Sequence, residues 1–118
     1  MYGLPQGINL EFFHGKTLIQ VCFGACDLIL HFDDSVSITV TSSLGCVDSS
    51  GNTQQYTDFQ QSAPAVLSLL NQSVSSAQGD DTGTLTLTFS NGEKLAIYDD
   101  SKIYESYIIN NQGKIIIV

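Results

Sequence analysis

The sequence predicts an α+β domain: an antiparallel sheet of about seven strands, strongly twisted or partly closed into a barrel, with one short helix packed over one face. Three observations predict this class. Apolar residues recur at every second position in several segments, an Asn-Gly turn joins two of these segments, and only one stretch has a helical pattern. A length of 118 residues is that of one domain, so we treat residues 1–118 as a single unit.

The first half of the sheet is predicted as a three-stranded meander within residues 16–41. Turn residues at 24–25 and 33–35 interrupt the alternation and indicate antiparallel hairpins. We therefore expect three strands, each with one buried face. Their apolar positions are Ile19, Val21 and Phe23, then Leu28, Leu30 and Phe32, then Val36, Ile38 and Val40.

The middle of the chain is predicted to be mostly irregular. Residues 42–62 are rich in Ser, Gly, Asn, Gln and Thr, which are typical of turns and loops. A short helix should follow from about Ala63 to Asn71, with Ser62 as its N-cap and Pro64 in its first turn. A helix this short needs packing on the sheet to be stable.

Two hairpins complete the predicted sheet. The first turns at Asn91-Gly92 between alternating strands, and its Leu85-x-Leu87-x-Phe89 pattern repeats that of the meander, through duplication or because both hairpins need the same residues. The second turns at residues 110–113. Its last strand, Ile115 to Val118, should lie inside the sheet, because an unpaired run of isoleucines would promote aggregation.

The charge balance restricts the partners. Twelve acidic and four basic residues leave a formal charge of -8, which repels nucleic acid and anionic membranes and attracts basic proteins. The first ten residues contain no secretory signal and no spanning helix, so we expect a cytoplasmic protein.

Little in the sequence indicates a metal, a cofactor or catalysis. The number of cysteines is odd, and Cys22, Cys26 and Cys46 lack the second pair of ligands that a zinc site needs. A disulfide between Cys22 and Cys26 across the first hairpin is one interpretation, but buried inert thiols are favoured. His14 and His31 are the only imidazoles, in turn and strand contexts, and no serine lies in a nucleophile motif. We therefore predict no cofactor, no metal site and no enzyme.

Acidic pairs recur at predicted turns or strand ends, at residues 33–34, 80–81 and 99–100. They either solvate the turns or together form an acidic rim; a calcium loop is not present. Among the tyrosines, Tyr98 and Tyr107 are expected in the core, whereas Tyr56, in a polar segment, is expected at an interface.

Three short motifs occur in a distinctive order. A strand ends in Phe-Asp-Asp at residues 32–34, a second ends in Phe-Ser-Asn-Gly at 89–92, and Tyr-Glu-Ser-Tyr at 104–107 precedes a final hairpin with glycine. Over about two thirds of the chain this order resembles a small bacterial family of unknown biochemical function, with Phe-Asp-Asp-Gly-like hairpins and a Tyr-Glu-x-Trp-like box. Ser35 and Tyr107 replace the glycine and tryptophan usual in that family.

The resemblance implies a function, because members of that family look similar to immunity proteins of toxin systems. We expect a protein that neutralises a cognate basic toxin, a nuclease in the leading version, by binding it. The first alternative is a small ligand-binding or structural β-module with residues 42–62 at the lip of a pocket, and one form of it is a homodimer through its apolar edge strand. The last alternative is a hydrolase using His14 or His31. The predicted partner-binding residues are Asp33, Asp34, Tyr56, Asp58, Asp99, Asp100, Tyr104 and Glu105.

Overall fold

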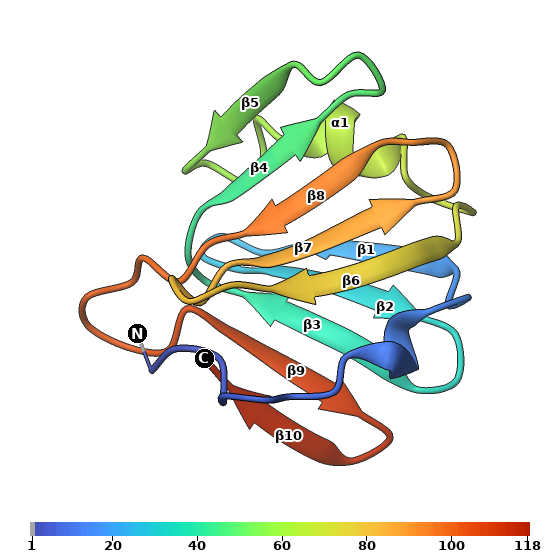
Figure 1. Ribbon diagram of the computed structural model, residues 1–118. Coiled ribbons are helices and arrows are strands. Elements are labelled where there is room, and N and C mark those ends of the chain that lie inside the picture. The colour runs from blue at the N-terminus through green and yellow to red at the C-terminus, as the bar shows by residue number, and fades with distance from the viewer. Residues whose placement is uncertain (1) are drawn as a thin grey trace.

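Two antiparallel five-stranded sheets face each other across one hydrophobic core (Figure 1). This is the arrangement in the computed structural model, which describes residues 2–118. The first sheet has the strand order β1-β2-β3-β9-β10 and the second β5-β4-β8-β7-β6. The described chain is a mostly-β sandwich with one short helix, so the predicted antiparallel, β-rich class is confirmed. The partly closed barrel, one of the two forms expected from the sequence, is wrong because the strands form two sheets that are not closed into a barrel.

The element bounds follow chain order. The strands of the first sheet are β1 (Leu18–Phe23), β2 (Leu28–Phe32), β3 (Val36–Val40), β9 (Tyr107–Asn111) and β10 (Lys114–Ile117). Those of the second are β4 (Leu44–Val47), β5 (Thr53–Tyr56), β6 (Val74–Gly79), β7 (Leu85–Phe89) and β8 (Lys94–Ile97). A 3-10 turn, η1 (Glu11–Phe13), and one short helix, α1 (Ala63–Leu67), complete the described elements.

The predicted alternation is confirmed in the central hairpins. Every second residue of β2, β3 and β7 is buried, and these side chains meet between the sheets. The Asn-Gly hairpin between β7 and β8 and the closing hairpin of β9 and β10 are also present. The two segments that share the Leu-x-Leu-x-Phe pattern end up in different sheets, as β2 and β7.

Three strands were not predicted, so the described chain has ten strands rather than seven. Residues 42–62 are not one loop, because β4 and β5 lie within them and β4 pairs with both β5 and β8. Gly45 gives β4 a weak strand pattern, yet it is required there: the phenol of Tyr98 occupies the space that a Cβ at Gly45 would need. The polar strand β6 pairs with β7 and was also missed.

Two local predictions are wrong. The helix ends at Leu67 rather than Asn71, and the Ser62 side chain does not cap it, because its hydroxyl donates a 2.6 Å hydrogen bond to the carbonyl of Phe59. Ile19 is 55% exposed instead of buried. A bulge after Leu18 shifts the register of β1 on β2, so the apolar phase changes within the strand.

The predicted position of the C-terminal strand inside the sheet is also wrong. β10 pairs with β9 alone and forms an edge of the first sheet, so Ile115 to Val118 do not lie inside it. Val118 is buried and Ile116 packs against the core, but Ile115 and Ile117 are 54% and 49% exposed.

Candidate functional site

Seven acidic residues lie in the connections at one end of the sandwich, the end on the left in Figure 1. Strand β8 finishes and β9 begins there, and pairing of Leu44 with both Tyr56 and Ile97 brings the end of β5 alongside. The turns between β1 and β2 and between β6 and β7 lie at the same end. We call this region the acidic end, comprising Asp27, Asp58, Asp80, Asp81, Asp99, Asp100 and Glu105 together with Lys102.

The charge is unequally divided between the two ends of the described chain. Seven of the twelve acidic residues and one of the four lysines lie at the acidic end, a formal charge of -6. The opposite end carries a formal charge of -2 from Glu11, Asp33, Asp34, Asp48 and Glu93 with Lys16, Lys94 and Lys114. The field of the protein is therefore directional, and it attracts cations and basic surfaces to one end.

The loop between β8 and β9 is anchored at its base by Asp99. One carboxylate oxygen accepts a 2.8 Å hydrogen bond from the amide of Gly3, and the other accepts one of 2.6 Å from the hydroxyl of Ser106. The amide of Ser101 donates to the same Ser106 hydroxyl at 3.1 Å. Asp99 thus joins the N-terminal segment to the loop and holds a structural position.

The same loop is tied to the connection between β3 and β4. Asp100 accepts hydrogen bonds from the amide and the hydroxyl of Ser43, and the Thr41 hydroxyl donates to the carbonyl of Glu105 at 2.6 Å. These bonds hold both sides of the loop and leave its tip in solvent. At the tip, Ile103 is 80% and Tyr104 55% exposed.

A groove of about 300 Å³ runs beside this tip. It is lined by Thr57, by residues 41–43 and by residues 100–104. The acidic end therefore combines a negative field, a shallow groove and two protruding apolar side chains. Such a combination suits contact with another macromolecule better than chemistry on an enclosed substrate.

The turn between β6 and β7 is built around Asp80. Its carboxylate accepts hydrogen bonds from the Thr82 hydroxyl at 2.6 Å, from the Thr82 amide at 2.9 Å and from the Thr84 amide at 3.0 Å. The Thr82 hydroxyl lowers the pKa of Asp80 most, desolvation opposes it, and the Thr84 and Thr82 amides add to the lowering. Asp80 therefore stays ionised and adds to the negative field.

Tyr107 supports that turn from the core. It is fully buried, and its hydroxyl donates a 2.6 Å hydrogen bond to the carbonyl of Gly83. Burial, and then the nearby Asp80 charge, raises the pKa of Tyr107 far above its usual value. The expected core position of Tyr107 is confirmed, and its polar tip fixes the turn that carries the acidic pair.

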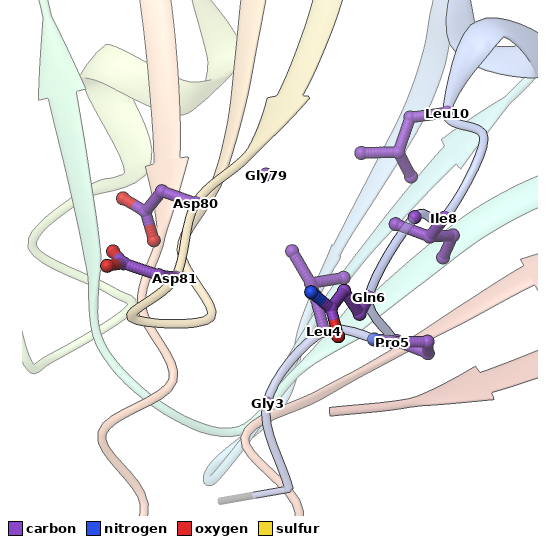
Figure 2. A pocket seen from close by; sticks show the side chains of 10 residues that line it. Gly3, Leu4, Pro5, Gln6, Ile8, Leu10, Gly79, Asp80 and Asp81 are labelled. Carbon is purple, nitrogen blue, oxygen red and sulfur yellow. The ribbon is translucent and has the colours of Figure 1, made fainter.

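A second cavity, of about 500 Å³, lies between the N-terminal segment and the end of β6 (Figure 2). The side chains of Leu4 and Leu10 extend toward Gly79, where a Cβ would collide with Leu4. The carboxylates of Asp80 and Asp81 point away from the N-terminal segment. The cavity is therefore a trough with an apolar wall on the side of the N-terminal segment. Residues 42–62 do not line this trough, but several of them line smaller hollows elsewhere.

Six of the eight predicted partner-binding residues are at the acidic end or on its border. Asp58, Asp99, Asp100, Tyr104 and Glu105 lie in its loops, and Tyr56 is the half-buried last residue of β5, packed partly against the core.

Asp33 and Asp34 are separated from the other six, at the opposite end. Asp33 accepts a 3.1 Å hydrogen bond from the Thr17 amide, and Asp34 forms a 3.2 Å ion pair with Lys16. Sequence reasoning missed Ile103 as a member of the site, although an isoleucine in a polar interval between strands was a usable signal.

The remaining candidate groups are dispersed. His14 is exposed after η1, and His31 faces outward from β2 between Gln20 and Ser37. The three cysteines are free thiols, and burial raises the pKa of Cys46 to about 11, with a further contribution from Glu93. Within residues 2–118, no three His, Cys, Asp or Glu side chains are grouped so that they could hold a metal ion.

The comparison with family models decides the classification. Residues 10–118 match the model of a family of unknown function, DUF6188. The chain belongs to this family. Membership of a family of unknown function agrees with the sequence analysis, whereas the likeness to immunity proteins stays a prediction. No curated protein and no solved structure matches the chain.

The described part of this DUF6188 member contains no helix of the length and apolar character needed to cross a membrane.

Proposed function

We propose that this DUF6188 protein is an immunity protein that binds a basic toxin, in the leading version a nuclease, and blocks it with the acidic end. The observation that carries the proposal is the coincidence of seven acidic residues with the exposed Ile103 and Tyr104 at one end of the sandwich. A nuclease needs a positive surface for its polyanionic substrate, so a negative surface of this kind can occupy the same cleft.

The charges and the apolar tip would have different parts in binding. The formal charge of -6 at the acidic end would speed the encounter with a cationic partner and orient it. Tyr104 and Ile103 would then supply buried contact area, which usually determines how slowly a complex dissociates. The anchors at Asp99 and Asp100 limit the ordering needed on binding, since the loop is already held at both sides.

Binding of this kind needs no turnover and no cofactor. The complex would form stoichiometrically in the cytoplasm, where a nuclease toxin reaches nucleic acid, and no contact of the protein itself with nucleic acid or with a membrane is required. Purified protein mixed with the toxin encoded by the neighbouring gene should form a complex in calorimetry and should suppress cleavage of a nucleic-acid substrate. If neither a complex nor protection is observed, the proposal is wrong.

The role of charge in binding is tested by two variants that make the same change in charge at opposite ends of the sandwich. Asp81→Lys at the acidic end and Glu11→Lys at the opposite end change the net charge of -8 by the same amount, and both side chains are exposed. We expect Asp81→Lys to slow association several-fold and to weaken its salt dependence, with Glu11→Lys close to wild type. Equal effects of the two variants on the association rate would contradict a directional field.

The apolar part is tested by the dissociation rate. Tyr104→Ala should raise it by roughly tenfold or more if the ring is an interface anchor. Ile19→Ala, which removes an exposed side chain from β1, is the control and should leave it unchanged. Charge reversal at Asp99 or Asp100 is less informative, because these carboxylates hold the loop itself.

A small-ligand module is the second candidate, and the trough beside the N-terminal segment is the observation that favours it. Its volume of about 500 Å³ is within the range of small-molecule sites, and Leu4 and Leu10 give it an apolar wall. The fluorescent apolar probe anilinonaphthalene sulfonate should bind the folded protein, and Leu4→Gln should abolish the signal. Binding that is absent or unchanged by Leu4→Gln would exclude the trough as a ligand site.

A further inference from the structure

On the outer face of the first sheet, two rows of side chains cross all five strands, and neither row contains a charged side chain. One row of outward residues crosses β1, β2, β3, β9 and β10 as Cys22, Ile29, Thr39, Ile108 and Ile117. The next row is Gln20, His31, Ser37, Asn110 and Ile115. In a chain with a formal charge of -8, this face is where an equally acidic molecule can approach with the least repulsion.

At one edge of this face, β10 presents backbone groups that no described residue pairs. The amide of Val118 donates to the carbonyl of Tyr107 at 2.9 Å and its carbonyl accepts from the amide of Ser106 at 2.8 Å, so the backbone groups of Val118 point to the start of β9. Because backbone groups alternate in direction along an antiparallel strand, those of Ile116 and Lys114 also point to β9. Those of Ile115 and Ile117 point outward from the edge.

The other three sheet edges have features that discourage pairing. β1 has a bulge after Leu18, β6 has one after Val74, and β6 also contacts η1. β5 is short and polar, with the sequence Thr-Gln-Gln-Tyr. β10 has a regular register and three consecutive isoleucines, with Lys114 as its one charged residue. Natural proteins rarely leave such an edge exposed.

We propose that β10 pairs with β10 of a second copy of this chain, which joins the two first sheets into one continuous ten-stranded sheet. A two-fold axis at Ile116 would place Ile115 opposite Ile117 of the second copy, so that the outward backbone groups of both strands form hydrogen bonds. The exposed side chains of Ile115 and Ile117 from both copies would then form one apolar cluster on the uncharged face.

Charge also favours a second copy in this antiparallel orientation. β10 runs from Lys114, at the less acidic end, toward the acidic end at Ile117. Antiparallel pairing therefore sets the acidic end of each copy beside the Lys114-bearing end of the other, and the two strongly negative ends stay apart. One strand pair buries less than the roughly 1,600 Å² of a standard interface, so the dimer should dissociate on dilution.

The test uses the purified protein alone, so its outcome is independent of any toxin. In sedimentation equilibrium from about 10 µM to about 1 mM, the mass should rise from the 12.8 kDa of the chain toward twice that value. Ile115→Lys and Ile117→Lys should each raise the dissociation constant at least tenfold. Ile19→Lys is the matched control, since Ile19 is equally exposed on the opposite edge of the same sheet.

Disulfide formation at residue 116 tests the expected pairing register of the two β10 strands. Across the two-fold axis, Ile116 would face its own copy as a non-hydrogen-bonded pair about 4.5 Å apart between Cα atoms, a distance that permits a disulfide. In a Cys22→Ser, Cys26→Ser background, Ile116→Cys should form a disulfide-linked dimer under mild oxidation and Ile19→Cys should not. The remaining thiol, Cys46, has a pKa of about 11 and reacts slowly.

A wild-type protein that stays monomeric over the whole concentration range, with circular dichroism confirming its fold, would overturn the proposal. A dimer that dissociates with Ile19→Lys but not with Ile115→Lys would overturn it as well, because the interface would then lie at β1. Oxidation that links Ile19→Cys but not Ile116→Cys would contradict pairing through β10.

Discussion

Replacement of Tyr107 by phenylalanine tests how the core is joined to the acidic end. The variant keeps the buried ring but removes the hydroxyl that donates a 2.6 Å hydrogen bond to the carbonyl of Gly83. Gly83 is itself buried, so its carbonyl loses a partner at a site with little access to water. The turn that carries Asp80 and Asp81 should then be held less firmly.

The expected loss follows from the cost of an unsatisfied buried acceptor. Such a group costs about 1–3 kcal/mol, and we expect about 1.5 kcal/mol here because the ring itself is retained. The unfolding entropy of a chain of this length is about 0.25 kcal/mol/K, so the midpoint of thermal unfolding should fall by about 6 °C. Differential scanning calorimetry measures this shift, and urea unfolding gives the free energy directly.

Tyr104→Phe is the matched control, since it removes the same atom from a ring that is 55% exposed. Its unfolding free energy should remain within about 0.5 kcal/mol of wild type. If both variants lose the same stability, or if Tyr107→Phe loses none, the hydrogen bond to Gly83 does not have the role assigned to it.

Two further predictions concern β4. Gly45→Ala should destabilise the protein by about 1–2 kcal/mol, because the Tyr98 phenol must move away from the new methyl group. In a double-mutant cycle, Tyr98→Phe should restore part of that loss, and strictly additive free energies would contradict the contact. Cys46 keeps its proton to about pH 11 in the folded chain but loses it near its ordinary pKa of 9.0 when unfolded, so stability should fall as the pH rises through this window. Tyr107, whose pKa is also raised, adds its own decrease above about pH 10. Cys46→Ala should therefore have a shallower slope than wild type between pH 9 and 10 in pH-dependent urea unfolding, and a wild-type slope there would refute the assignment.

The elements that sequence analysis found are those specified by local chemistry. In β2, β3 and β7, apolar residues alternate without interruption between recognisable turns, so both the strands and their buried faces could be predicted. The missed strands have no such pattern. β5 and β6 are polar segments, and they are strands because β4 and β7 offer them a ladder of backbone hydrogen bonds.

The candidate site was predicted in composition but not in arrangement. The acidic pairs do lie at turns or strand ends, as local turn chemistry indicates. Which pairs lie together depends on the direction of the preceding strand: β2 runs toward one end of the sandwich, and β8 runs toward the other. Asp33 and Asp34 are therefore separated from Asp99 and Asp100, which the linear sequence could not reveal.

The sequence by itself determined the negative charge, the β-rich class and the hairpins around residues 32–36 and 89–94, because composition and local turn chemistry are sufficient for each. Tertiary structure alone decided that β10 lies at an edge, that Ile19 faces solvent, and that the negative charge is concentrated beside Ile103 and Tyr104. The physical reason is that backbone pairing between distant segments sets strand order and direction, and these determine which side chains share a surface.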